Sequence, residues 1–80
     1  MKIVIDKEVV GELTDDGEII ANDIWLQKLA DRIRRQKLTD LRSRKTGHEH
    51  YGYLVAVQKG DPGYVSAVAE ILLDNGYGLE

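Results

Sequence analysis

The first quarter of the chain places apolar and polar residues in patterns that predict short β-strands. Residues 2–6 (Lys-Ile-Val-Ile-Asp) are rich in β-branched side chains, and residues 8–13 (Glu-Val-Val-Gly-Glu-Leu) have the composition of a partner strand. The turn between them would be Asp6-Lys7. Gly11 lies inside the second strand, which indicates a β-bulge or the close approach of another element. Residues 14–17 (Thr-Asp-Asp-Gly) predict a further turn, followed by a short extended piece.

After this turn the spacing of apolar residues changes to a helical period. One stripe recurs at this spacing and consists of Trp25, Leu26, Leu29, Ala30 and Ile33. Asn22 is suited to be the N-cap, and Asp23 suits the positive first turn of a helix. We therefore predict an amphipathic helix over residues 23–37. Because Trp25 belongs to the apolar stripe, we expect its indole to be buried in the core.

Residues 38–45 and 50–58 predict two further strands that are joined by a hairpin at Lys45-Thr46-Gly47. The first segment is also compatible with an extension of the helix, although Thr39 and Ser43 weaken that interpretation. The second segment is the most strand-like in the chain, because it is aromatic, β-branched and free of Lys, Arg, Asp and Glu. Its apolar residues occupy both faces, which predicts a central strand.

Residues 61–77 carry the clearest helix signals in the chain. Asp61 is placed as the N-cap, Pro62 occupies the first helical position, and Asn75-Gly76 is a natural left-handed terminator. One apolar stripe lies between these ends and is formed by Tyr64, Val65, Val68, Ile71 and Leu72. Tyr77 is placed to pack back on the final turn.

The predicted order of elements is β-β-α-β-β-α, which indicates an α+β fold. Because the connections are short, neighbouring strands are expected to be antiparallel. We predict a small, mainly antiparallel four-stranded sheet with two helices on one face. Residues 1–78 are expected to form this single domain, and residues 79–80 (Leu-Glu) are interpreted as a remnant of cloning outside it.

The composition is ordinary for a folded domain, with 42% hydrophobic and 31% charged residues among 80. The absence of cysteine excludes disulfides and thiolate metal sites. No apolar run approaches the roughly 20 residues that span a bilayer, and the N-terminus has no signal-peptide pattern. We therefore expect a cytoplasmic protein with no membrane partner and no cofactor.

Charge changes this picture, because it is distributed unevenly along the chain. The formal net charge is −3, yet residues 1–23 carry two basic and seven acidic side chains, whereas residues 24–50 carry eight basic and three acidic ones. Rows of arginine suit bidentate phosphate contacts and the release of counterions. The candidate anion- or nucleic-acid-binding residues are Lys28, Arg32, Arg35, Arg42, Arg44, Lys45, His48 and His50.

The hairpin arm of this set has two alternative registers. A three-residue loop would place Arg44 opposite His48 and Arg42 opposite His50. A two-residue loop would instead pair the two arginines with a carboxylate and a tyrosine, Glu49 and Tyr51. The second register gives the mixture of basic and aromatic side chains that is typical of proteins that bind single strands.

His48 and His50 are alternate residues of one predicted strand and would point the same way. Metal sites generally need three or four protein ligands, so we expect no metal here. Two imidazoles beside an arginine also suit general acid–base cleavage of RNA. A helix, a basic hairpin with Gly47-His48, a strand and a closing helix resemble part of the HicA-type ribonuclease toxins. The Gly-Ser-His element of that family is absent here, so the chain is not assigned to it.

Three functional hypotheses follow. The first is a non-enzymatic binding module whose anionic partner is nucleic-acid backbone. The second is a protein-interaction or assembly subunit, in which the basic residues meet an acidic protein surface, such as the acidic N-terminal third of a second copy in a homodimer. The third is a ribonuclease that depends on His48 and His50. The alternative to all three is a solvated polar face with local ion pairs, such as Asp31 with Arg35 at i, i+4.

Overall fold

The computed structural model describes residues 1–43 and 52–80, and its N-terminal residues form the predicted hairpin. Strand β1 (Lys2–Ile5) pairs antiparallel with β2 (Glu8–Leu13), and Asp6 and Lys7 form the turn with φ values of +50° and +67°. Two consecutive residues with positive φ are the signature of a type I′ turn, whose twist matches that of the flanking strands. The predicted turn at Asp6-Lys7 is therefore confirmed.

Gly11 shows both features that its position predicts. Gly11 pairs with Ile3 and Val9 with Val4, so Val10 is the extra residue of a β-bulge. A Cβ at Gly11 would overlap the carbonyl oxygen of Ile20 and lie 2.7 Å from Cδ2 of Leu26. Leu26 belongs to helix α1 (Ile24–Arg35). The helix can approach the sheet this closely because position 11 carries no side chain.

Two short strands complete the four-stranded antiparallel sheet. They are β3 (Ile19–Ala21) and β6 (Gly78–Leu79), and the strand order is β3-β2-β1-β6. Strand β6 pairs with β1, and Glu80 exchanges two backbone hydrogen bonds with Lys2. Residues 79–80, which the sequence interpretation leaves outside the fold, thus take part in the sheet.

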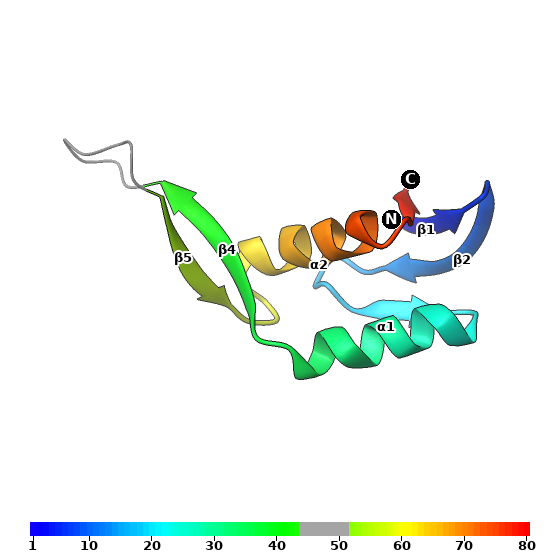
Figure 1. Ribbon diagram of the computed structural model, residues 1–80, viewed down its shortest axis with the longest axis horizontal. Helices are drawn as coiled ribbons and strands as arrows, with labels where there is room; N and C mark the ends of the chain where they lie inside the picture. The colour runs from blue at the N-terminus through cyan, green and yellow to red at the C-terminus, as the bar shows by residue number, and fades with distance from the viewer. Residues whose placement is uncertain (44–51) are drawn as a thin grey trace.

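Strands β4 (Leu38–Ser43) and β5 (Gly52–Val57) form a separate two-stranded sheet, which extends from the rest of the molecule (Figure 1). The predicted α+β class, with a four-stranded antiparallel sheet and two helices, is confirmed. The membership of that sheet differs, because the places beside β2 and β1 are taken by β3 and β6. Among the described residues β5 pairs with β4 alone, so the predicted central position of this strand is wrong.

Helix α2 (Pro62–Asp74) begins and ends as predicted. Pro62 is the first helical residue, and the carboxylate of Asp61 accepts a 2.8 Å hydrogen bond from the Gln58 backbone N–H. Gly76 has a φ of +89°, and the Tyr77 backbone N–H donates to the Leu72 carbonyl at 3.0 Å. Within the described ranges, neither helix combines the length and apolar character needed to cross a bilayer.

One core joins the sheet, both helices and the base of the hairpin. Its buried side chains come from the sheet (Ile3, Val10, Leu13, Ile19), from α1 (Leu26, Leu29, Ala30, Ile33), from α2 (Ala67, Val68, Leu72) and from Leu38 and Val57. Both helices therefore cover the same face of the sheet. The opposite sheet face lies toward solvent and includes Val9 and Ile20, which are about half exposed.

Candidate functional site

Helix α1 presents the predicted basic residues because of the way it is capped and packed. Asp23 is the N-cap, in place of the predicted Asn22, and its Oδ1 accepts a 2.7 Å hydrogen bond from the Leu26 backbone N–H. The helix ends at Arg35, two residues before the predicted end. It buries Leu26, Leu29, Ala30 and Ile33 against the sheet. The intervening positions must therefore face solvent.

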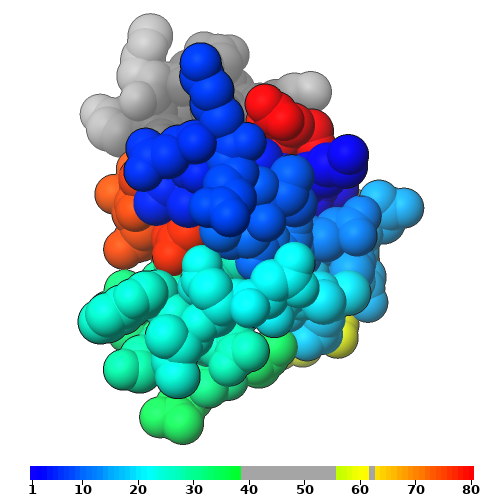
Figure 2. All heavy atoms as spheres, turned by 90° about the vertical axis from the view of Figure 1, so that its right-hand side faces the viewer, coloured from blue at the N-terminus to red at the C-terminus, as the bar shows by residue number. Residues whose placement is uncertain are grey.

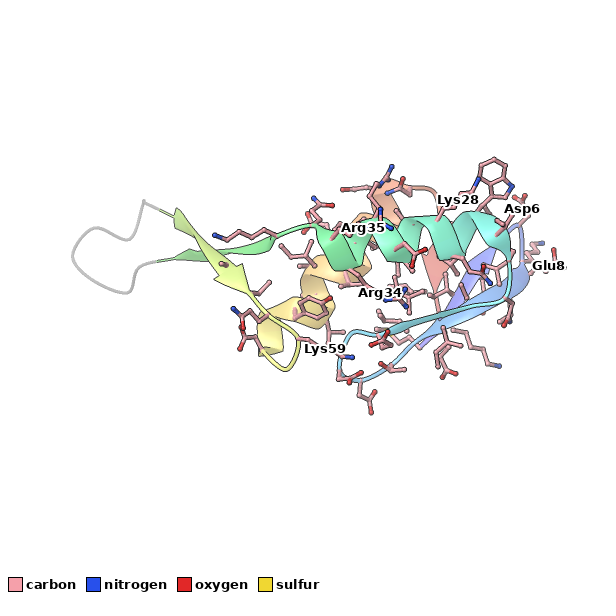
Figure 3. All side chains as sticks on the ribbon, turned by 90° about the horizontal axis from the view of Figure 1, so that it is seen from below. Asp6, Glu8, Lys28, Arg34, Arg35 and Lys59 are labelled. Atoms are coloured by element: carbon pink, nitrogen blue, oxygen red, sulfur yellow. The ribbon has the colours of Figure 1, made fainter. Side chains whose placement is uncertain are left out.

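Lys28, Arg32 and Arg35 lie on this outer face, and all three are exposed. We call them the basic stripe. Figure 3 shows Lys28 and Arg35 along one edge of α1, with Arg34 on the opposite edge. None of the ion pairs found between described residues includes a member of the stripe.

The ion pair expected between Asp31 and Arg35 does not form. Asp31 instead accepts a 2.8 Å hydrogen bond from Arg34 at i, i+3. Arg34 is fixed from a second side, because its guanidinium also reaches Glu18 at 3.2 Å. The Asp31 carboxylate, although adjacent in sequence to Arg32 of the stripe, is therefore directed toward the edge of the helix that carries Arg34.

Trp25 lies at the N-terminal end of the basic stripe and is 70% exposed, so its predicted burial is wrong. The apolar stripe centres on Leu26, Leu29 and Ile33, and Trp25 falls outside it. The Lys28 ammonium lies 4.9 Å from the centroid of the indole ring, which is within the range of a cation–π contact. The outer face of α1 therefore combines an aromatic ring with three positive charges.

A shallow groove of about 320 Å³ runs between this part of α1 and the segment that follows α2. It is lined by Trp25, Lys28, Leu29, Arg32, Asn75 and Tyr77. Figure 2 looks onto the end of the molecule where α1 lies near the C-terminal end of α2. Burial raises the pKa of the Tyr77 phenol above its ordinary value.

Lys28 and Arg32 are among the predicted anion-binding residues, whereas the other side chains of this groove are not. A signal for Trp25 was present, because Lys28 and Arg32 stand three and seven residues after it and thus share its side of a helix. Asn75 and Tyr77 gave no such signal, since their proximity to α1 depends on how the two helices pack.

Two other cations near the core, Arg34 and Lys59, are held by carboxylates. Glu18 accepts hydrogen bonds from both Lys59 and Arg34, and Lys59 also lies 3.9 Å from Asp16. The Lys59 hydrogen bond, followed by the Arg34 bond, holds the pKa of Glu18 below its ordinary value. The same hydrogen bond raises the pKa of Lys59. These groups connect the turn before β3 to α1 and to the loop after β5.

A larger groove of about 500 Å³ lies beside this charged cluster. Its apolar lining includes Ile19, Ala30, Ile33, Leu38, Val57 and Tyr64. Lys37 also lines it, and the other charged groups at its rim, Glu18, Arg34 and Lys59, are joined through the two ion pairs of Glu18. Their pairing makes them weaker candidates for anion recognition than the basic stripe.

The hairpin arm of the predicted site starts where α1 ends. Strand β4 leaves the C-terminal end of the helix and runs outward (Figure 1). Arg42 pairs with Tyr53 in the ladder, which differs from both predicted registers. Arg44, Lys45, His48 and His50 lie outside the described residues, and their convergence with α1 stays a prediction.

Two further findings bear on function. In residues 1–43 and 52–80, no three His, Cys, Asp or Glu side chains gather in a way that would hold a metal ion. Comparison of the chain with protein-family models, with curated proteins and with solved structures finds no match.

Proposed function

We propose that the protein is a non-enzymatic module that binds nucleic acid, with the basic stripe of α1 contacting the phosphate backbone. One observation carries this proposal: Lys28, Arg32 and Arg35 are exposed on one helix face, while Arg34 and Lys59 are held by carboxylates. Cations that already neutralise carboxylates gain little from a phosphate. Among the cations in residues 1–43 and 52–80, those of the basic stripe are therefore the best placed to contact a phosphate.

The spacing of the stripe suits an extended anionic ligand. From Lys28 to Arg35 the helix axis advances roughly 10 Å at 1.5 Å per residue. At 3.4 Å per nucleotide along one strand of a DNA duplex, this length corresponds to about three phosphates. Each phosphate that the stripe neutralises releases condensed counterions. Binding is therefore expected to be weak, sequence-tolerant and strongly dependent on salt.

The acidic remainder of the chain supports a single binding face. The chain as a whole carries −3, and the acidic side chains Asp6 and Glu8 lie at the end of the molecule beyond Lys28 (Figure 3). A polyanion would be repelled by those surfaces and attracted by the stripe. Such a charge distribution orients the partner during approach as well as holding it.

A low-salt binding titration tests the proposal. Labelled DNA and RNA oligonucleotides would be titrated with the wild-type protein and with a triple variant, Lys28→Gln, Arg32→Gln and Arg35→Gln. The wild type should bind and the triple variant should lose most of its affinity. Lys2→Gln is the matched control, because β-strand alternation places Lys2 opposite the buried Ile3 and away from α1. Absence of binding by the wild type to any oligonucleotide at low salt would remove the proposal.

Self-association is a second candidate function, favoured by the outer face of the sheet. Val9 is 47% and Ile20 is 54% exposed there, although both are large apolar side chains. Apolar side chains on an exposed sheet face mark a protein interface where they form one contiguous patch. Sedimentation at increasing protein concentration tests this candidate, and a species that stays monomeric at the highest concentration would reject it.

A further inference from the structure

We infer that the outer face of α1 recognises single-stranded nucleic acid, with an unpaired base stacking on the indole of Trp25. This inference rests on the proposed function and adds the class of nucleic acid and the residue that selects it. Backbone contacts by cations are made with single strands and duplexes alike. A stacking platform is different, because it requires a base whose flat face is free.

The exposure of Trp25 is the first argument. An indole is the largest apolar side chain, and this one is 70% exposed although the same helix buries four smaller residues. With so much of its surface accessible, the ring cannot be covered on both faces. Lys28 lies over one face at 4.9 Å, which leaves the other face for a base.

The groove beside Trp25 is the second argument. Its volume of about 320 Å³ is at the low end of the range of small-molecule sites, which is roughly 300–1,000 Å³. It therefore suits one nucleotide unit better than a duplex. The side-chain amide of Asn75 donates to the Ile71 carbonyl at 2.7 Å, which leaves its oxygen as an acceptor for a base edge. Tyr77 adds a second aromatic side chain to the lining.

The order of these groups along α1 is the third argument. Trp25 lies near the start of the helix, and Lys28, Arg32 and Arg35 follow it on the same side. A strand with one base on Trp25 would have its next phosphates along the stripe, in the direction of β4. This combination of an aromatic platform and a row of cations is the general arrangement of single-strand binding surfaces.

Trp25 is the only tryptophan in the chain, so its fluorescence reports this site alone. The experiment titrates the protein with a single-stranded oligonucleotide, with the matching duplex and with inorganic polyphosphate, which has the charge but no bases. Stacking should quench the fluorescence with the single strand. Polyphosphate and the duplex should bind in proportion to their charge with little quenching.

Variants complete the test. Trp25→Ala should weaken single-strand binding by about 5- to 100-fold, as expected for the loss of one stacked base. Trp25→Phe should lose less, because it keeps an aromatic face. Duplex and polyphosphate binding should change little in either variant. Leu73→Ala is the matched control, since it removes another exposed apolar side chain, one that does not line the groove.

The outcomes separate this inference from the proposed function. If single strand and duplex bind equally and Trp25→Ala changes neither, the inference is wrong while backbone binding stands. If no nucleic acid binds at low salt, both are wrong. If the protein binds no nucleic acid and Trp25→Ala abolishes a dimer seen by sedimentation, the exposed indole belongs to a protein interface instead.

Discussion

The salt dependence of binding provides a quantitative test of which cations contact nucleic acid. For a single strand, the logarithm of the binding constant falls with the logarithm of salt concentration by about 0.7 for each phosphate neutralised. The three residues of the basic stripe therefore predict a slope near −2. This slope corresponds to a loss of about 16-fold in affinity between 50 and 200 mM salt.

The same measurement tests whether the hairpin arm takes part. If Arg42, Arg44 and Lys45 also contact the strand, six phosphates are neutralised and the slope approaches −4. Changing those three residues to glutamine together should then bring the slope back to about −2. If the helix alone makes the contacts, the hairpin variant should keep the wild-type slope.

Fluorescence anisotropy of a labelled single strand, measured at five or six salt concentrations, would give each slope. Lys28→Gln, Arg32→Gln and Arg35→Gln should each make the slope less steep by about 0.7. Lys2→Gln should leave it unchanged, because this residue lies on the far face of the sheet. An equal effect of Lys2→Gln and the stripe variants would refute the assignment, since it would mean that net charge alone governs binding.

Two further predictions concern the structure that positions the stripe. Gly11→Ala should lower the free energy of unfolding by about 1–3 kcal/mol in a denaturant titration, because the added Cβ would overlap the backbone carbonyl oxygen of Ile20. Gly60→Ala is the comparison variant, because Gly60 has a positive φ but open space around it, so this change introduces backbone strain without overlap. The second prediction is that Glu18→Gln destabilises the protein only slightly at neutral pH, because the two ion pairs that it removes, those with Arg34 and Lys59, are exposed to solvent. Because the folded pKa of Glu18 is lowered, its contribution is present above its ordinary pKa and is lost as pH falls through the folded value. The stabilities of wild type and Glu18→Gln should therefore converge in acid, and a difference that stays constant down to low pH would contradict the pairing.

Local signals along the chain predicted most of the elements. The turn at Asp6-Lys7, the bulge beside Gly11 and both ends of α2 depend on residues within one turn of each other, and each was predicted correctly. Which strands join one sheet depends on pairing between segments. Backbone hydrogen bonds make this pairing, and they do not depend on which side chains the strands carry. Strands β3 and β6, of three and two residues, are too short for periodicity to identify as partners of β2 and β1.

Trp25 shows why exposure within a helix is harder to predict than the helix itself. A spacing of four residues drifts by about 40° per step around a helix, so a stripe through positions 25, 29 and 33 is broad. Either Trp25 or Leu26 can lie at the centre of the buried face. The sheet decides between them, because the space above Gly11 is filled by the side chain of Leu26. The larger indole is left at the edge.

Tertiary contacts also determine which cations of α1 are free of carboxylate partners among the described residues and can contact an anion. At i, i+3 and i, i+4, Asp31 can pair with Arg34 or with Arg35, and the helix alone does not choose strongly between them. Arg34 lies on the flank that faces β3, where Glu18 and the Ile19 carbonyl also accept its hydrogen bonds. These contacts fix the Arg34 guanidinium and draw Asp31 toward it. The packing that builds the core thus directs the Asp31 carboxylate away from Arg35. As a result, a chain with a net negative charge has a positively charged face on α1. The exposed positive charge of Arg35 therefore follows from the fold. Arg34→Gln, which removes the partner of Asp31, should let Asp31 pair with Arg35 and weaken the proposed binding to nucleic acid more than Lys59→Gln, which removes the same charge but leaves Asp31 paired.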